Sequence, residues 1–143
     1  MSTRLARIGV FVIDLLAAVS AVGGGIAILV GTIQFPSEWL SRTPFASFTG
    51  PALILALVVG GSALVAAGLA LLAGRELGVL ASLAAGAIMM GWVVGETVML
   101  GYISWLQPVM FGVGILMLLT AGWWWIAGSR QTTFHPTGWR RAA

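Results

Sequence analysis

The sequence contains no cysteine, no lysine and no asparagine, and its single histidine is His135. Without cysteine, disulfide bonds, thiol catalysis and thiolate metal sites are excluded. One histidine cannot build a multi-histidine metal or haem centre within the chain. The phosphate-binding glycine motifs and the G-x-S-x-G motif of serine hydrolases are also missing. We therefore assign no metal, no cofactor and no catalytic residue, and activity as an enzyme is left open but not favoured.

Charged residues are scarce as well. They make up 8% of the 143 residues, as seven arginines and four acidic residues, while 59% are hydrophobic. Soluble domains usually carry about 25% charged residues, so these eleven cannot cover a soluble fold. The composition predicts a polytopic membrane protein whose main partner is the lipid bilayer. The arginines are scattered near the ends of apolar segments, so we expect no nucleic-acid partner.

Four apolar segments are long enough to cross about 30 Å of hydrocarbon as helices. They are residues 8–30, 51–73, 78–101 and 109–127. Their continuous apolar runs do not alternate as barrel strands do. We predict an all-α fold, an antiparallel bundle of four transmembrane helices that forms one domain over residues 1–143, of which residues 128–143 are a cytoplasmic tail.

The turn between the second and third helices is short, which makes these two helices an antiparallel hairpin. Gly74 and Gly128 are expected to end the second and fourth helices. The basic N-terminus and first apolar run also fit a cleaved signal peptide, but the run continues to Val30, which favours an uncleaved span.

The arginines predict the orientation of the bundle. Arg42 lies on one side of the four spans, whereas six arginines lie on the other: Arg4, Arg7, Arg75, Arg130, Arg140 and Arg141. Because basic residues prefer the cytoplasmic side, both termini should be cytoplasmic. Residues 31–50 and 102–108 should face outward.

Small residues recur at four-residue spacing, which permits close helix contact in membranes. The stripes are Ala17, Ala21 and Gly25; Ala56 and Gly60; Ala63 and Ala67; Ser82 and Gly86; and Ala87, Gly91 and Gly95. Either they all seal the bundle, or one of them makes an interface in a homo-oligomer or a larger complex. The run from Trp123 to Trp125 is typical of an interfacial aromatic belt.

Glu96 is the acidic residue that most needs an explanation. It lies about 7.5 Å inside the outer end of the third span, where a carboxylate is costly unless paired or hydrated. Trp92 lies four residues earlier on the same helical face. We expect Trp92 and Glu96 to line a cavity open to the outer face. Alternatively, Glu96 only stabilises the fold through Gln34, Tyr102 or a loop N–H.

The outward segment over residues 34–45 is too apolar for a free loop. Pro36 and Ser37 predict the start of a short interfacial or re-entrant helix, with Glu38 and Arg42 at i,i+4. The segment could cover the outer ends of the spans as a lid. The candidate ligand-binding or proton-linked residues are Glu96, Trp92, Gln34, Trp39, Tyr102, Trp105 and Gln107.

Asp14 is the second intramembrane carboxylate. It lies about 9 Å from the cytoplasmic end of the first span, where we expect a polar group meeting Arg75 or Arg7. It is too far from Glu96 for a pair of catalytic carboxylates.

Three sequence patterns carry a resemblance: Pro36-x-Glu38-Trp39-Leu40 with Thr43-Pro44-Phe45, Gly91-Trp92-x-x-x-Glu96, and Ser104-Trp105-Leu106-Gln107-Pro108. With them the chain resembles small bacterial four-span membrane proteins. In span number and orientation it is similar to the DoxX-like proteins. The resemblance implies a multi-pass protein of the bacterial cytoplasmic (inner) membrane and implies no activity or site residue.

Two functions fit these observations. The absence of catalytic groups and the small-residue stripes favour a non-enzymatic accessory or oligomeric membrane component. The alternative is a binder or transporter of a small molecule, lipid or ion that uses an outward-facing Trp92/Glu96 cavity, with a lipid or a small apolar molecule as the ligand.

Overall fold

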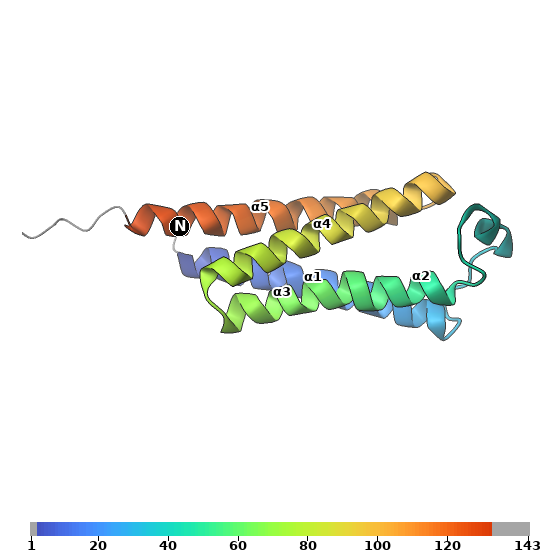
Figure 1. Ribbon diagram of the computed structural model, residues 1–143, viewed down its shortest axis with the longest axis horizontal. Helices are drawn as coiled ribbons and strands as arrows, with labels where there is room; N and C mark the ends of the chain where they lie inside the picture. The colour runs from blue at the N-terminus through green and yellow to red at the C-terminus, as the bar shows by residue number, and fades with distance from the viewer. Residues whose placement is uncertain (1–2, 133–143) are drawn as a thin grey trace, which may run out of the picture.

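The computed structural model describes residues 3–132, which form helices joined by short loops and contain no strand. In chain order the elements are α1 (Thr3–Leu29), the 3₁₀ helix η1 (Ser37–Arg42), α2 (Thr49–Leu53), the π-helical segment η2 (Ile54–Gly60), α3 (Gly61–Leu72), α4 (Arg75–Leu100) and α5 (Leu106–Thr132). Figure 1 shows the long helices side by side along one axis.

Four helices are long and apolar enough to cross a membrane: Thr3–Leu29, Thr49–Leu72, Arg75–Leu100 and Leu106–Ser129. The second combines α2, η2 and α3 without a break. The prediction of an all-helical fold with four such helices is confirmed. Each helix begins two to five residues before the predicted span, because the apolar criterion counts only the hydrocarbon-crossing part of a helix.

The bundle has two different ends. The turn end holds the start of α1, the turn between α3 and α4 and the last turns of α5, whereas the loop end holds residues 30–48 and 101–105. In Figure 1 the N-terminus lies beside the red end of α5, and the teal η1 projects at the opposite end. The predicted tail residues 133–143, which include His135, lie outside the described residues.

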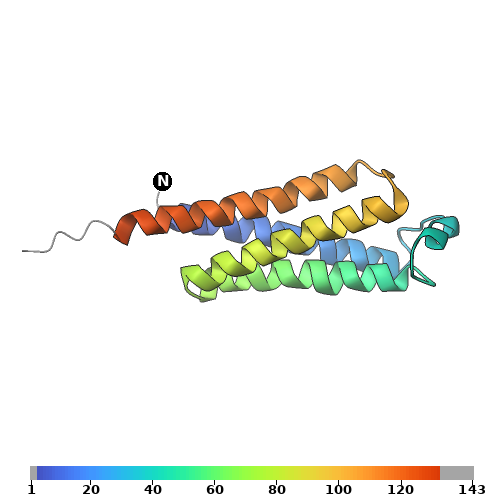
Figure 2. The same ribbon diagram turned by 45° about the horizontal axis from the view of Figure 1, so that its top comes forward.

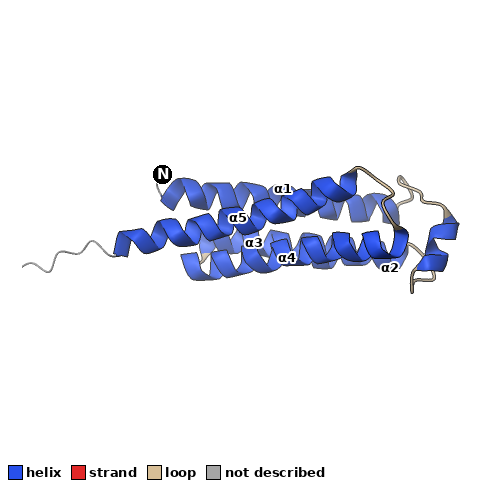
Figure 3. Cartoon of the chain, turned by 90° about the horizontal axis from the view of Figure 1, so that it is seen from above, coloured by secondary structure: helices blue, strands red, loops and turns tan. Residues whose placement is uncertain are grey.

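The helices form a four-membered ring in cross-section. α1 packs against α3, η2 and α5, and α4 packs against α3 and α5, so that α1 and α4 lie diagonally. Figures 2 and 3 show the same neighbours from two further directions. Each long helix runs antiparallel to the next, as the short connections require.

Small side chains dominate the core. Near the middle of the bundle, Ala17, Ala21, Ala63, Ala66 and Ala85 are all buried, around Met89 and Met117. A second cluster at the turn end joins Val10, Ala70, Val79, Ala121 and Trp124. Such small residues let helix backbones approach closely.

Glycines mark the closest helix contacts. A Cβ on Gly25 of α1 would lie 2.6 Å from the carbonyl oxygen of Ala52, and one on Gly60 would lie 2.6 Å from Val22 Cγ2. The stripes through Gly25, Gly60 and Gly86 therefore do seal the bundle. The stripe with Gly91 and Gly95 does not, because nothing lies within 4 Å of a Cβ at either position.

Two cap predictions were wrong. Gly74 lies at the N-cap of α4, and Ala73 takes the extended C-cap position after α3. Gly128 lies inside α5, which continues to Thr132, and its missing side chain makes room for Arg75. Gly31 (φ 77°) and Gly101 (φ 80°) adopt the left-handed backbone instead, just after α1 and α4, where glycine avoids steric strain.

η1 begins at Ser37, as predicted, but it is a 3₁₀ helix. Because a 3₁₀ helix has three residues per turn, positions i and i+4 do not share a face. The expected Glu38–Arg42 pair accordingly does not form, and both side chains are exposed. Trp39 and Leu40 are half-buried, so the apolar side of η1 faces the bundle.

Candidate functional site

A cavity lies at the loop end, between the ends of α1, η2, α4 and α5 and under residues 33–48. It consists of two adjoining chambers of about 170 Å³ and 330 Å³. Gly24, Leu55, Trp92, Glu96 and Ile103 line both chambers. The larger chamber reaches into the bundle as far as Met89 and Met110. Trp92 and Glu96, which the sequence analysis placed at one cavity, thus both line it, while its opening to the outer face of a membrane stays a prediction.

Glu96 is the one ionisable residue among those that line the two chambers. Its side chain is half-buried, and no described residue forms a hydrogen bond or an ion pair with its carboxylate. The expected alternative, a bond to Gln34, Tyr102 or a loop N–H, does not occur among the described residues. The carboxylate is thus available to a ligand in the cavity.

Aromatic rings cover the smaller chamber. Phe35 stacks on Trp39 with ring centroids 5.4 Å apart and an interplanar angle of 27°, and it contacts Phe48 at 5.4 Å with a tilt of 51°. The Phe45 ring lies against Gly50, where a Cβ would come within 2.7 Å of Cδ1. Rings of this kind offer an apolar body and a negative π face to a ligand.

Gln107 lines the larger chamber, but its amide is already hydrogen-bonded. Its Nε2 donates to the carbonyl of Gly101 at 3.2 Å, and its Oε1 accepts from the N–H of Ile103 at 3.1 Å. The residue is 5% exposed, so these bonds attach the loop over 101–105 to the start of α5. Gln107 shapes the wall of the cavity.

Three predicted site residues lie away from the cavity. Gln34 is exposed and donates to the carbonyl of Gly31. Tyr102 and Trp105 are each 71% exposed, and Tyr102 borders a separate groove beside Val93 and Val98. The structure thus brings together Glu96, Trp92, Trp39 and Gln107.

Asp14 lies in the bundle interior, with none of its surface exposed. Ser82 Oγ donates a hydrogen bond of 2.5 Å to its Oδ2 across the diagonal between α1 and α4, while Oδ1 has no partner. The expected contact with Arg7 or Arg75 is wrong. Arg7 instead donates to the carbonyls of Ala70 and Leu71 at the end of α3.

The apolar lining was the part that sequence reasoning missed. Besides Trp39, the outward segment contributes Phe35, Phe45 and Phe48 to the smaller chamber. The unusual apolarity of this segment was the feature of the sequence that could have predicted an apolar lining. No group of three or more metal-ligating acidic, histidine or cysteine side chains occurs within residues 3–132.

Comparison with known proteins returns no match to a family model, a curated protein or a solved structure.

Proposed function

We propose that the chain is a multi-pass protein of the bacterial cytoplasmic membrane, with the turn end and both termini in the cytoplasm. Large apolar side chains are exposed along every long helix, such as Leu72 (89%) and Val98 (79%). Exposed apolar surface on this scale is suited to lipid. Arg4, Arg7 and Arg75 lie at the turn end and Arg42 at the loop end, which supports the orientation through the positive-inside rule.

The absence of cysteine makes this topology easy to test. Ala46 at the loop end and Glu76 at the turn end are both exposed, so Ala46→Cys and Glu76→Cys each add one accessible thiol. In intact bacterial cells, a membrane-impermeant maleimide should label Ala46→Cys and not Glu76→Cys. After permeabilisation it should label both. The opposite pattern would reverse the orientation, and equal labelling before permeabilisation would argue against insertion.

We further propose that the protein binds, without catalysis, a small molecule that has an apolar body and a cationic group. The observation that carries this proposal is Glu96, a carboxylate without a partner among the described residues, in a cavity lined mainly by apolar and aromatic side chains. A larger chamber of about 330 Å³ is within the usual size range of ligand pockets, about 300–1,000 Å³.

The energetics favour a cation over a neutral ligand. A carboxylate in an apolar environment loses hydration, and an opposite charge nearby restores part of that loss. The aromatic faces of Trp92 and Trp39 add cation–π attraction of about 0.5–2 kcal/mol when the cation is desolvated. A molecule of the same shape without charge would gain only the apolar contacts.

The test uses two probes of the same shape, phenyltrimethylammonium and its neutral isostere tert-butylbenzene. Binding is measured by calorimetry on the protein in lipid nanodiscs. The wild type should prefer the cation, and Glu96→Gln should reduce this preference about tenfold, as expected for loss of one desolvated charge interaction of about 1.4 kcal/mol. Glu38→Gln is the matched control, because Glu38 is exposed at the same end outside the cavity.

Equal binding of both probes by the wild type would contradict the proposal. So would an unchanged preference in Glu96→Gln. A thermal melt of each variant shows that the loss is local and that Glu96→Gln remains folded.

A second candidate is an oligomeric or accessory membrane component, favoured by one observation. Ala87 and Gly91 are exposed on α4, and open space lies over Gly91 and Gly95. A neighbouring helix could approach closely there. If it does, Gly91→Leu should shift the mass measured by light scattering in mild detergent toward the monomer, whereas Gly68→Leu, on the open face of α3, should not.

A further inference from the structure

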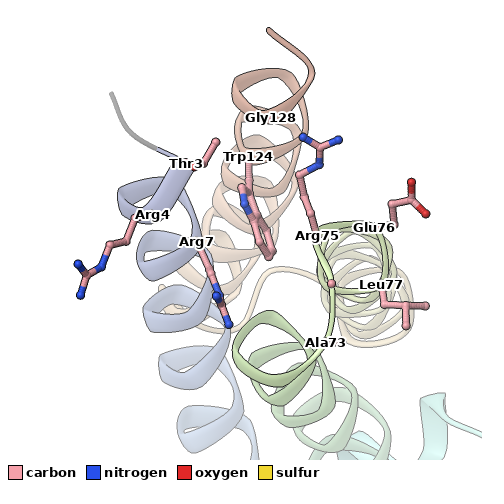
Figure 4. A pocket seen from close by; sticks show the side chains of 10 residues that line it. Thr3, Arg4, Arg7, Ala73, Arg75, Glu76, Leu77, Trp124 and Gly128 are labelled. Atoms are coloured by element: carbon pink, nitrogen blue, oxygen red, sulfur yellow. The ribbon is translucent and has the colours of Figure 1, made fainter. Parts of the chain in front are cut away.

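The turn end holds a feature that the proposed function does not use. An open groove of about 770 Å³ lies between the start of α1, the turn between α3 and α4, and the last turns of α5. Figure 4 shows Trp124 at its centre, with Arg7 on one side and Arg75 on the other. Three arginines and one acidic residue, Glu76, line it, so the groove carries a positive charge.

These arginines are not neutralised by any of the described residues. No ion pair joins them to a carboxylate among the side chains that the structure describes. In Figure 4 the Glu76 carboxylate points away from the groove, and Arg4 also points outward. The charge that faces the groove therefore comes from Arg7 and Arg75.

Arg75 is held in place by packing, yet its hydrogen-bond donors have no partner in the described part of the chain. Its guanidinium carbon lies 5.4 Å from the centroid of the Trp125 ring. On another side it lies against Gly128, in the space that a Cβ would occupy. No described residue accepts a hydrogen bond from it. A guanidinium that is oriented in advance and unpaired is well suited to phosphate, which it can bind through two parallel bonds.

Arg7 is also oriented, by its bonds to the carbonyls of Ala70 and Leu71. These bonds use Nε and Nη2, while the guanidinium has further donors. Because the carbonyls lie at the C-terminus of α3, Arg7 offsets the negative end of the helix dipole. An anion in the groove therefore does not face uncompensated carbonyls.

The surroundings place this groove at the level of lipid headgroups. Trp123 and Trp125 are half-exposed beside it, and exposed tryptophans concentrate at the membrane interface. Leu72 and Leu77 are 89% and 57% exposed next to the turn, so an acyl chain can lie against the bundle just below the groove. A soluble phosphate would gain nothing from these leucines.

We infer that this groove binds the phosphate of an anionic phospholipid of the cytoplasmic leaflet through Arg75 and Arg7. The inference depends on the proposed membrane insertion and not on ligand binding at the loop end. Basic pockets between helix ends on the cytoplasmic side commonly have this role.

The test is lipid retention by the intact protein, measured by native mass spectrometry. The protein in detergent is mixed with equal amounts of phosphatidylglycerol and phosphatidylcholine, and the ratio of the two bound lipids is recorded. Arg75→Gln should lower this ratio about fivefold, the effect expected for one arginine near a charged lipid surface. Arg42→Gln, which removes an exposed arginine at the loop end, should leave the ratio unchanged.

Gly128→Ala separates local geometry from total charge. The added methyl group would displace the flexible end of Arg75 without changing the net charge, so it should also lower the ratio. Arg7→Gln serves as a further variant, but it also removes the bonds to α3. Arg75→Gln, which removes no hydrogen bond among described residues, is the decisive one.

Three outcomes would overturn the inference. One is an unchanged ratio in both Arg75→Gln and Gly128→Ala, and another is an equal loss in Arg42→Gln, which would indicate a general charge effect. The third concerns the thermal unfolding of the wild type. If inorganic phosphate protects it as strongly as phosphatidylglycerol does, the groove binds a soluble anion. The thiol-labelling experiment tests membrane insertion separately, so a failure there is distinguishable from a failure here.

Discussion

The two halves of the bundle use the same helices differently. At the turn end, alanines and Val10, Val79 and Trp124 fill the interior. At the loop end, the interior holds two chambers, and aromatic side chains from residues 33–48 cover them. The interior of the bundle is therefore filled at the turn end, where the groove lies outside it, and holds a covered cavity at the loop end.

The two acidic residues within the apolar parts of the long helices, Asp14 and Glu96, show the same contrast. Asp14 is completely buried and accepts a hydrogen bond from Ser82, whereas Glu96 is half-buried and has no partner within the described chain. Asp14 connects two diagonal helices, so its interaction contributes to the fold. Glu96 forms no hydrogen bond or ion pair with any described residue and lines the cavity instead.

The largest expected effect is on stability, from removal of the Asp14–Ser82 bond. Ser82→Ala leaves a fully buried carboxyl without its partner, which should lower the free energy of unfolding by about 2–3 kcal/mol. Thermal unfolding in detergent, followed by tryptophan fluorescence, measures the change.

Its control is the double variant Asp14→Ala/Ser82→Ala. If the two side chains interact as the structure indicates, the double variant should lose at least about 0.5 kcal/mol less than the sum of the two single variants. Strictly additive losses would show that Asp14 and Ser82 are independent.

A pair of matched alanine substitutions tests the difference in packing. Ala121 is fully buried in the turn-end cluster, so Ala121→Leu should cost about 1–3 kcal/mol through overpacking. Ala21 is also buried but borders the larger chamber, so Ala21→Leu should cost less than Ala121→Leu, because the added atoms can extend into the chamber, and it should weaken probe binding by filling that space. Equal losses of stability would contradict the distinction between the two halves.

The smallest expected effect is that of Glu96→Gln on stability. Because no described group pairs with the carboxylate, its neutralisation should change the free energy of unfolding by no more than about 0.5 kcal/mol. The same melting experiment measures it. A loss as large as that of Ser82→Ala would mean that Glu96 stabilises the fold through an interaction absent from the described residues.

Much of the site was foreseeable, and the misses have physical reasons. The cavity at Trp92 and Glu96 follows from i,i+4 spacing and the cost of a carboxylate in lipid. Tyr102 and Trp105 were misplaced because loop residues next to one another in sequence can face opposite sides, and no local rule orients them. Asp14 was expected near arginines since charge attracts charge, but helix rotation placed it opposite Ser82.

The sequence by itself determined the helical class, the number of apolar helices and the two acidic residues that need explanation. These depend on local hydropathy, helix length and charge count. Tertiary structure alone decided which small-residue stripes meet, that the Gly91 stripe stays open, and that aromatic rings from a connecting segment cover a chamber. Those outcomes depend on how helices rotate and approach one another, which arises from packing between residues far apart in the chain.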